Sequence, residues 1–368
     1  FTDLHGRFVR TAEQAPLGDA DYFAVPGLFD LQVNGYGGHD YSSTNLTPTE
    51  VIQICEHMVE IGTLYHLPTI ITRPQESILH SLETIETARS TSTMVDTCIR
   101  GYHIEGPYIS GIDGPRGAHD PDYIRNPDIL EYQEWQAASR NRIKIVTLAP
   151  ERPGSIAFIE RLVEDGVVAA IGHSAASPDE IRSAVAAGAR MSTHLGNGSH
   201  RTVPRLHNYI WEQIAADELT AGIIADGFHL PDAVIKTMTR AKGLQRVVLV
   251  SDLSPMAGLD PGSYIWDKIE IEVDDDGRVG VAGSPFFAGA WRSLASAIPV
   301  FMHATGASLH DTIRLVTTGA ADAVGLGGWY RGLSTDDSVT LFTFDRKRRS
   351  FQSVLSALDG LVIHRTAL

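Results

Sequence analysis

Residues 143–194 read IKIVTLAPERPGSIAFIERLVEDGVVAAIGHSAASPDEIRSAVAAGARMSTH. Short apolar runs rich in β-branched residues alternate here with amphipathic stretches of helical period. The second amphipathic stretch opens with Ser177 and Pro178, and a serine followed by proline is typical of a helix N-terminus. Strands that alternate with helices along the chain pair in parallel. The stretch therefore predicts β/α units in series.

The same unit repeats on both sides of this stretch, and eight apolar runs in all have the length and composition of strands. Eight β/α units in series are the number that closes into a (β/α)8 barrel of the TIM type. The predicted strands are 25–33, 63–71, 98–104, 143–148, 167–171, 189–193, 220–225 and 247–250. The predicted helices include 48–61, 75–89, 156–164, 178–187 and 231–242.

Both ends of the chain have a different pattern. Residues 1–22 and 333–362 contain short alternating runs, such as 338–344 and 350–355, with little helical period. We expect the two termini to form one small β-sandwich module, made of 1–25 plus 333–368, beside a barrel of residues 26–332. A hairpin of 264–273 and 278–282 is predicted as an insertion after the eighth strand, followed by helices over 291–303 and 309–317.

Charge and composition exclude several classes of partner. The 30 Lys and Arg residues face 45 Asp and Glu residues, a net charge of −15, which argues against binding nucleic acid. The short basic run 346–349 is interpreted as a solvated strand end or turn. The two cysteines, Cys55 and Cys98, fit neither a disulfide framework nor a thiolate zinc site, so we expect a cytoplasmic protein. No apolar run approaches the roughly 18 residues that span a bilayer, so no membrane partner is expected.

Polar residues cluster where the predicted strands end, the edge that carries the catalytic site in this barrel. One Glu, two His and one Asp from four strands can converge there. A Glu/His/His set suits Zn²⁺ or Fe²⁺ and leaves a position for water, and a nearby Asp can accept that water's proton. The strand ends read DLQVNG (30–35), HIEGP (103–107), IGHS (171–174), THL (193–195), ADGFH (225–229) and VSD (250–252).

Six motifs in order make the chain recognisable. PGLFDLQVNG, HIEGPYISGIDGPRGAHDP, IGHSAAS, STHLGNGSH, IIADGFHL and LVSDLSPMAG lie between residues 26 and 332. They resemble the motifs of the N-acetylglucosamine-6-phosphate deacetylases in the amidohydrolase superfamily, and HxEGP with IADGxH is specific to this branch. The resemblance implies a metal-dependent hydrolase that releases acetate from an amino sugar phosphate, foremost N-acetylglucosamine 6-phosphate.

The resemblance also assigns roles to single residues. It implies that Glu105, His173 and His194 hold one divalent metal ion, with Zn²⁺ preferred over Fe²⁺. It implies that Asp252 is the catalytic acid and base, and that His119 contacts the amide carbonyl. The positions implied to hold the sugar and its phosphate are His229, Asn197, Gly198 and Arg205. In this family the arginine reaches across a dimer interface, so a homodimer is expected.

Two departures from the pattern bear on the metal and the substrate. Gln32 and Asn34 stand where superfamily members with two metals carry HxH, so the second metal should be weak or absent, and we place both amides on the substrate side. Gly196 to Ser199 replace an aromatic followed by Asn-Ala-Met, which removes apolar bulk from a substrate-facing loop. Another N-acyl amine, such as an unphosphorylated amino sugar or an N-acyl amino acid, remains an alternative substrate. A barrel that binds a sugar phosphate without catalysis is the other alternative.

Overall fold

The structure, a computed structural model, describes residues 22–328, 330, 338–345, 350–358 and 361–365. Its centre is an eight-stranded parallel sheet whose neighbours run in the order β11-β10-β9-β8-β7-β6-β5-β2. The edge strands meet through a parallel bridge between Val33 and Leu253, which closes the sheet into a barrel. The strands are β2 (Phe29–Val33), β5 (Tyr65–Ile71), β6 (Tyr102–Glu105), β7 (Ile143–Leu148), β8 (Val168–Ile171), β9 (Met191–Ser192), β10 (Thr220–Ile223) and β11 (Val247–Leu249).

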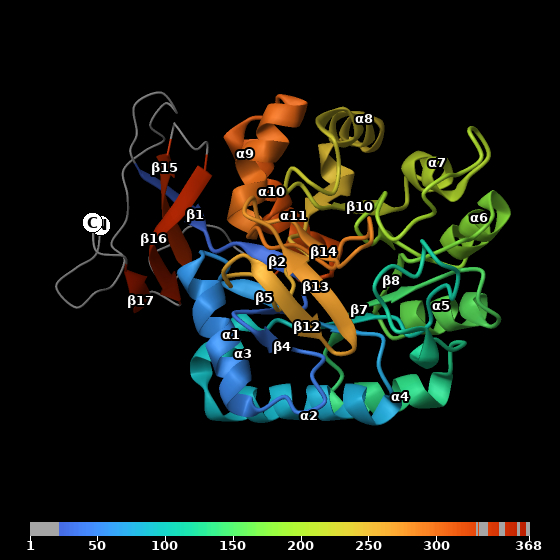
Figure 1. Cartoon of the computed structure of the whole chain (residues 1–368), viewed down its shortest axis with the longest axis horizontal. Coiled ribbons are helices and arrows are strands. Elements are labelled where there is room, and N and C mark those ends of the chain that lie inside the picture. The colour runs from blue at the N-terminus through green and yellow to red at the C-terminus, as the bar shows by residue number, and fades with distance from the viewer. Residues whose placement is uncertain (1–21, 329, 331–337, 346–349, 359–360, 366–368) are drawn as a thin grey trace.

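Helices cover the outside of the barrel, as Figure 1 shows, and the predicted (β/α)8 architecture is confirmed. Local sequence explains the helix starts. Ser177 and Glu180 form a reciprocal capping box at α6, and Thr47 and Glu50 form another at α1. The helices are α1 (Pro48–Glu60), α2 (Gln75–Thr91), α3 (Thr93–Cys98), α4 (Ile129–Ala138), α5 (Ser155–Glu164), α6 (Pro178–Ala186), α7 (Tyr209–Ala215), α8 (Asp232–Lys242), α9 (Leu294–Thr305), α10 (Leu309–Leu315) and α11 (Thr318–Ala323).

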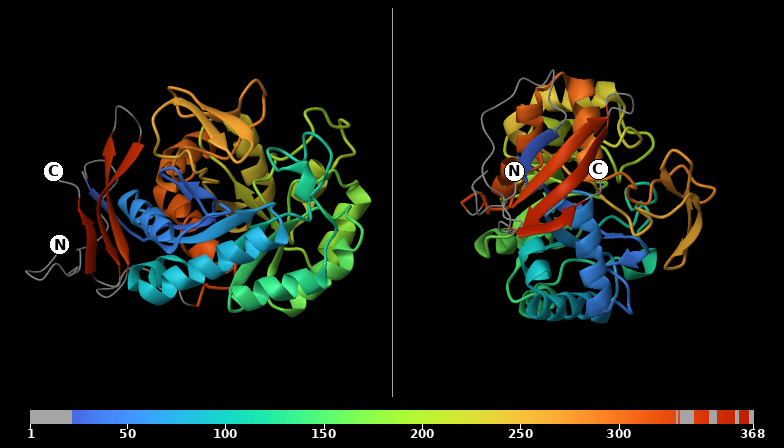
Figure 2. Two further views of the ribbon diagram at one scale, coloured as in Figure 1. Left: turned by 60° about the horizontal axis from the view of Figure 1, so that its bottom comes forward. Right: turned by 90° about the vertical axis from the view of Figure 1, so that its left-hand side faces the viewer.

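The two ends of the chain come together in one antiparallel sheet at the side of the barrel (Figure 2). Its strand order is β1-β15-β16-β17, with β1 (Tyr22–Pro26), β15 (Val339–Asp345), β16 (Ser350–Leu358) and β17 (Leu361–Arg365). The expected terminal module is therefore present, and its described residues form a single sheet instead of a two-layered sandwich. The predictions for residues 1–21 and for the basic run 346–349 lie outside the described residues.

Two predicted strands are divided by turns. The run 25–33 splits at Gly27 and Leu28 into β1 of the terminal sheet and β2 of the barrel, after the break signal of Pro26-Gly27. Gly27 packs closely on Leu64, where a Cβ would lie 2.6 Å from Leu64 Cδ1. The run 264–273 is likewise two strands, since Asp267 adopts a left-handed φ of 57° that reverses the chain. The insertion is therefore a three-stranded sheet of β12 (Gly262–Trp266), β13 (Ile269–Val273) and β14 (Val279–Val281), which projects from the barrel (Figure 2).

Two further features complete the fold. A short hairpin of β3 (Gly35–Tyr36) and β4 (His39–Asp40) follows the first barrel strand. Within the described part of the chain, no helix combines the length and the apolar character needed to cross a membrane.

Candidate metal centre and active site

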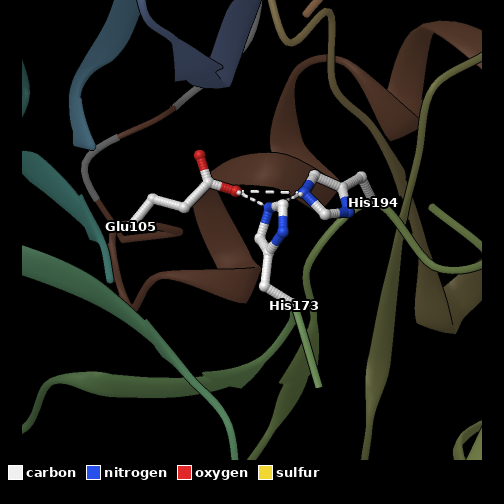
Figure 3. A group of neighbouring side chains, drawn as sticks. All are labelled: Glu105, His173 and His194. Atoms are coloured by element: carbon white, nitrogen blue, oxygen red, sulfur yellow. Dashed lines mark hydrogen bonds and ion pairs between the residues drawn. The ribbon is translucent and has the colours of Figure 1, made fainter. Parts of the chain in front are cut away.

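Glu105, His173 and His194 meet at one point although they come from three parts of the chain (Figure 3). Glu105 ends β6, His173 follows β8, and His194 follows β9. Glu105 Oε1 lies 3.1 Å from His173 Nε2 and 3.0 Å from His194 Nε2. The two imidazole Nε2 atoms are 3.0 Å apart, and all three side chains are buried. The structure thus brings together the three residues predicted as metal ligands.

The chemistry of this donor set fits a divalent cation. Nδ1 of His173 lies 2.9 Å from the carbonyl oxygen of Pro115, a contact that fixes the ring hydrogen on Nδ1 and leaves a lone pair on Nε2. Two buried imidazole nitrogens that face each other and a carboxylate oxygen form a cluster that a shared cation would hold together. Two nitrogens and one carboxylate oxygen are a donor set that Zn²⁺ or Fe²⁺ accepts.

The protein also holds Glu105 in its charged form. Burial would raise the pKa of Glu105, but the close contacts of its carboxylate with the rings of His173 and His194 keep this pKa well below its ordinary value. Burial would likewise lower the pKa of His194, but the hydrogen bond and charge of Glu105 raise it overall. Gln32 also supports the charged form of Glu105, because its Nε2 donates a hydrogen bond to Oε1 of Glu105 over 3.1 Å. Gln32 therefore orients the carboxylate and does not line the cavity described below.

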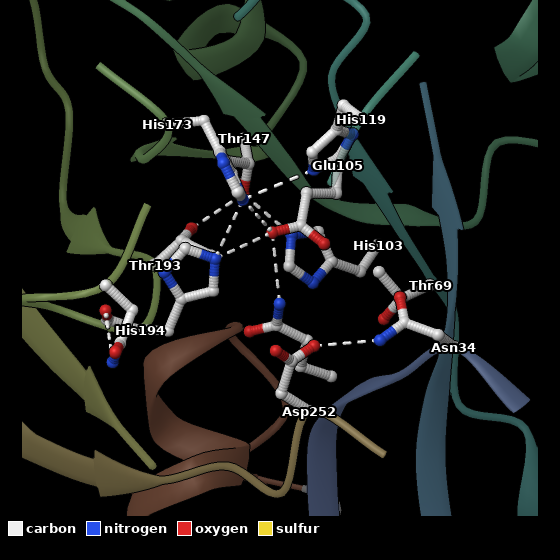
Figure 4. Close-up of polar contacts among 12 residues, drawn as sticks. Asn34, Thr69, His103, Glu105, His119, Thr147, His173, Thr193, His194 and Asp252 are labelled. Atoms are coloured by element: carbon white, nitrogen blue, oxygen red, sulfur yellow. Dashed lines mark hydrogen bonds and ion pairs between the residues drawn. The ribbon is translucent and has the colours of Figure 1, made fainter. Parts of the chain in front are cut away.

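Three site residues share an uncommon backbone conformation directly after their strands. His173, His194 and Asp252 have φ values of 49°, 30° and 56°. The left-handed region is costly for residues other than glycine, and such residues gather at functional sites. The fold thus stabilises a conformation in which the side chains of these three residues point toward one another (Figure 4).

Asp252 stands beside the cluster and is held by Asn34. Asn34 Nδ2 donates to Asp252 Oδ1 over 2.8 Å (Figure 4). Burial, together with the negative charge of Glu105, raises the pKa of Asp252 to about 6. A carboxyl group with a pKa near neutrality can both accept and return a proton.

His119 reaches the same cluster from the loop after β6. Its Nδ1 lies 2.8 Å from Thr72 Oγ1, and its Nε2 lies 3.3 Å from His173 Nε2. Burial and the neighbouring His173 hold the pKa of His119 well below its ordinary value, so the ring is neutral. His103 of the same HIEGP run stays outside the cluster, because it contacts the Leu31 carbonyl oxygen and the Thr147 hydroxyl at 3.1 and 2.7 Å.

His229 follows β10 and is oriented by two neighbours. Its Nδ1 lies 2.7 Å from Asp226 Oδ2, and its ring stacks on Phe287 with a centroid distance of 4.2 Å. The hydrogen bonds from His229 help to lower the pKa of Asp226 against the effect of burial. The Asp226 carboxylate therefore orients His229.

A cavity of about 510 Å³ joins these residues. Nine of the predicted site residues line it, namely Asn34, Glu105, His119, His173, His194, Asn197, Gly198, His229 and Asp252. Sequence reasoning missed several lining residues, including Arg116 of the His119 loop and Trp266 and Lys268 of the inserted sheet. Arg116 lies within the quoted HIEGPYISGIDGPRGAHDP run. Trp266 and Lys268 belong to no quoted motif, and the folded insertion brings them to the cavity.

Comparison with known proteins identifies the relatives of this chain. No family model matches it. The human N-acetylglucosamine-6-phosphate deacetylase is 30% identical over 314 residues, which cover 82% of this chain and 74% of the human protein. The chain belongs to the N-acetylglucosamine-6-phosphate deacetylase family.

Two further proteins are similar to this chain, one in its solved structure and one in its sequence. A mutant deacetylase from Mycobacterium smegmatis, solved in complex with N-acetyl-D-glucosamine-6-phosphate, has a TM-score of 0.84 and 27% identity, covering 98% of this chain and 93% of that one. An N-acetylgalactosamine-6-phosphate deacetylase from Escherichia coli O157:H7 is 27% identical over 321 residues, or 87% of this chain and 83% of that protein.

The loop that departs from the deacetylase pattern does not leave an empty space at Gly196. A Cβ on Gly196 would lie 3.1 Å from Met238 Cε and 3.2 Å from Leu230 Cδ2, so a side chain here would point at buried apolar groups. Gly196 also lines the cavity.

Arg205 is the predicted phosphate ligand that the single chain does not bring to the site. Its side chain is exposed, and it is absent from the residues that line the cavity. Its carbonyl oxygen accepts a hydrogen bond from Trp211 Nε1 at 3.2 Å, which fixes this part of the loop beside α7.

Proposed function

We propose that this chain is a deacetylase that hydrolyses N-acetylglucosamine 6-phosphate to glucosamine 6-phosphate and acetate. The observation that carries the proposal is the convergence of Glu105, His173 and His194 on one point within a cavity that also holds Asp252. Membership of the deacetylase family supplies the reaction class. A protein that only binds a sugar phosphate has no use for a buried ligand cluster beside a carboxyl group that can transfer protons.

The proposed cofactor is a single divalent ion held by Glu105, His173 and His194, with Zn²⁺ preferred and Fe²⁺ as the other candidate. When bound, such an ion polarises the amide carbonyl and activates a water molecule at neutral pH. Gln32 and Asn34 occupy the positions of a second histidine pair, and both donate amide hydrogens to carboxylates, which disfavours a second cation.

Asp252 is proposed to move the proton. Asn34 engages Oδ1 of Asp252, which leaves Oδ2 to take a proton from the attacking water. The water oxygen bonds to the acyl carbon, the C–N bond breaks, and Asp252 returns the proton to the departing nitrogen. The products are acetate and the free amine.

His119 is proposed to stabilise the charge that develops on the carbonyl oxygen. The Thr72 hydroxyl can donate to Nδ1 of His119 at 2.8 Å, which places the ring hydrogen on Nε2. A neutral imidazole that donates from a fixed position toward a developing oxyanion lowers the barrier without needing reorganisation.

The sugar is proposed to lie against His229, Asn197 and Gly198, which also line the cavity. We further propose a homodimer in which Arg205 of a second copy approaches this cavity, because Arg205 is exposed in the single chain. A barrel of residues 26–332 with a module of 1–25 and 333–368 remains our domain division. The two cysteines, both free, fit a cytoplasmic location.

N-acetylgalactosamine 6-phosphate is the second candidate substrate, because a deacetylase of that sugar is among the relatives. The deciding experiment measures acetate release by the metal-loaded protein. The panel contains both phosphorylated sugars, unphosphorylated N-acetylglucosamine and an N-acetyl amino acid. We expect the highest kcat/KM with N-acetylglucosamine 6-phosphate. A higher value with any other member would replace the proposed substrate, and no acetate from any of them would refute the deacetylase function.

A further inference from the structure

The cavity is lined by both carboxylates and cationic side chains. Glu105 and Asp252 lie where the amide must sit for hydrolysis. A phosphate on the far end of the sugar carries a charge close to −2 at neutral pH and is repelled by these carboxylates. It must therefore be held away from them. Four cationic side chains line the rest of the cavity, namely Arg73, Arg116, Arg201 and Lys268, together with the carboxylates of Asp120, Asp122 and Asp267.

Three of these four cations are already paired with carboxylates. Arg73 is buried and lies 3.7 and 3.6 Å from the carboxylates of Asp40 and Asp267. Arg116 lies 3.1 Å from Asp113. Lys268 Nζ lies 3.0 Å from Asp120 Oδ2. Each ion pair neutralises part of the positive charge that would otherwise attract a phosphate.

Arg201 differs from the other three. Within the described residues its side chain has neither a hydrogen bond nor an ion pair, although it lines the cavity and is exposed. A guanidinium presents a planar fork of donors that matches two phosphate oxygens. Arg201 is thus the cation of the cavity that is free to bind an anion.

The backbone that carries Arg201 is held in place. The hydroxyl of the buried Tyr209 accepts from the backbone N–H of His200 at 2.9 Å and lies 3.0 Å from Nδ1 of the same residue. From the other side, Gly114 packs so closely that a Cβ there would lie 3.3 Å from His200 Cα. His200 also lines the cavity, so a second nitrogen donor stands beside the guanidinium.

We propose that Arg201, with His200 beside it, binds the phosphate of the substrate from within the same chain and determines the preference for phosphorylated sugars. This inference rests on the proposed deacetylase function, and it assigns to the chain's own loop a contact separate from that of Arg205.

The test measures binding apart from catalysis. Titration calorimetry follows N-acetylglucosamine 6-phosphate binding to the metal-loaded Asp252→Asn protein, with and without Arg201→Gln. Loss of a charge-assisted bidentate contact should weaken this affinity about 10- to 100-fold. Arg201→Lys, which keeps the charge but not the fork, should lie between the two. Arg240→Gln on the exposed face of α8 is the matched control for loss of one positive charge.

Steady-state kinetics give the second readout in proteins with intact Asp252. Arg201→Gln should raise KM for the phosphorylated sugar much more than it lowers kcat, so the preference over unphosphorylated N-acetylglucosamine falls by a similar factor. An affinity of the Arg201→Gln protein within twofold of its parent overturns the proposal, provided that melting curves of the two coincide. If the wild type releases no acetate at all, the proposed function fails, whereas the calorimetric comparison still decides the role of Arg201.

Discussion

The side-chain amide of Asn34 donates to Oδ1 of Asp252 over 2.8 Å and so links the first and last strands of the barrel at the active site. Two backbone hydrogen bonds join the same two strand ends. Asn34 N donates to the Leu253 carbonyl at 2.8 Å, and Asp252 N donates to the Gln32 carbonyl at 3.1 Å. Barrel closure and the orientation of the catalytic carboxylate therefore depend on the same pair of strands.

Replacing Asp252 by Asn should abolish turnover while the metal site persists. The carboxamide cannot accept the proton of water, and loss of a general base costs about 10²- to 10⁴-fold in rate. Asp252 is not one of the three residues whose ligand atoms converge, so the metal content should match that of the wild type. Acetate release and elemental analysis measure the two effects. Turnover within tenfold of wild type would remove Asp252 from this role.

Replacing Asn34 by Ala should lower kcat by about 10-fold, because the freed Asp252 carboxylate loses a hydrogen bond that holds its orientation. KM should change much less, since Asn34 acts through Asp252. Asn45→Ala, an exposed asparagine in the loop before α1, is the control for the same chemical change. Equal kcat values for the Asn34 and Asn45 variants would show that the carboxylate needs no such support.

Local pattern was enough to predict the barrel. The alternation of β-branched runs with capped amphipathic stretches is a property of neighbouring residues, as at Ser177 and Pro178, and it persists in the fold. The divided strands were missed for two reasons. Asp267 reverses the chain without an adjacent glycine. The Pro26-Gly27 dipeptide is a break signal within the run 25–33, which was interpreted as one strand.

The candidate site was predictable only in part, for a similar reason. Glu105, His173 and His194 sit at strand ends, and the barrel topology alone requires strand ends to share one edge. By contrast, the contact of Thr72 with His119 spans 47 positions. Lys268 meets Asp120 across 148 positions, through an inserted sheet whose placement on the barrel no periodicity encodes. Such contacts depend on loop packing and require the folded structure.

Two substitutions at the metal centre should weaken metal binding to different extents. Glu105→Gln removes the anionic ligand and should abolish stoichiometric binding. Gln32→Ala removes only a hydrogen bond to Glu105 Oε1 and should weaken binding by about 10- to 100-fold. Chelator-treated protein titrated with Zn²⁺ in a calorimeter measures both. A second tight equivalent in the wild type would contradict a single-metal site, and unchanged binding in Glu105→Gln would refute the ligand assignment.

Asp30 offers a stability test that is independent of catalysis. Its Oδ1 accepts from the backbone N–H groups of Gln32 and Ser251 at 3.2 and 3.1 Å, whereas its buried Oδ2 has no partner among the described residues. Burial raises the pKa of Asp30 from 3.8 to about 6, although hydrogen bonds from Ser251 and Gln32 oppose this rise. The folded state therefore holds the proton more tightly than the unfolded state. The contribution of Asp30 to the free energy of unfolding is fully present below pH 3.8 and is lost as the pH rises through about 6.

Asp30→Asn does not titrate and should escape this loss. The free energy of unfolding of the variant minus that of the wild type should rise by about 3 kcal/mol between pH 4 and pH 7, since one pKa unit corresponds to about 1.4 kcal/mol. Urea unfolding of both proteins across this range gives the difference, in which the titration of all other groups cancels. Asp275→Asn, which changes an exposed carboxylate in the turn between β13 and β14, serves as the control for the loss of one surface charge. A flat difference for Asp30→Asn would mean that the buried carboxyl group finds a compensating partner, and the explanation of its pKa by burial would be wrong.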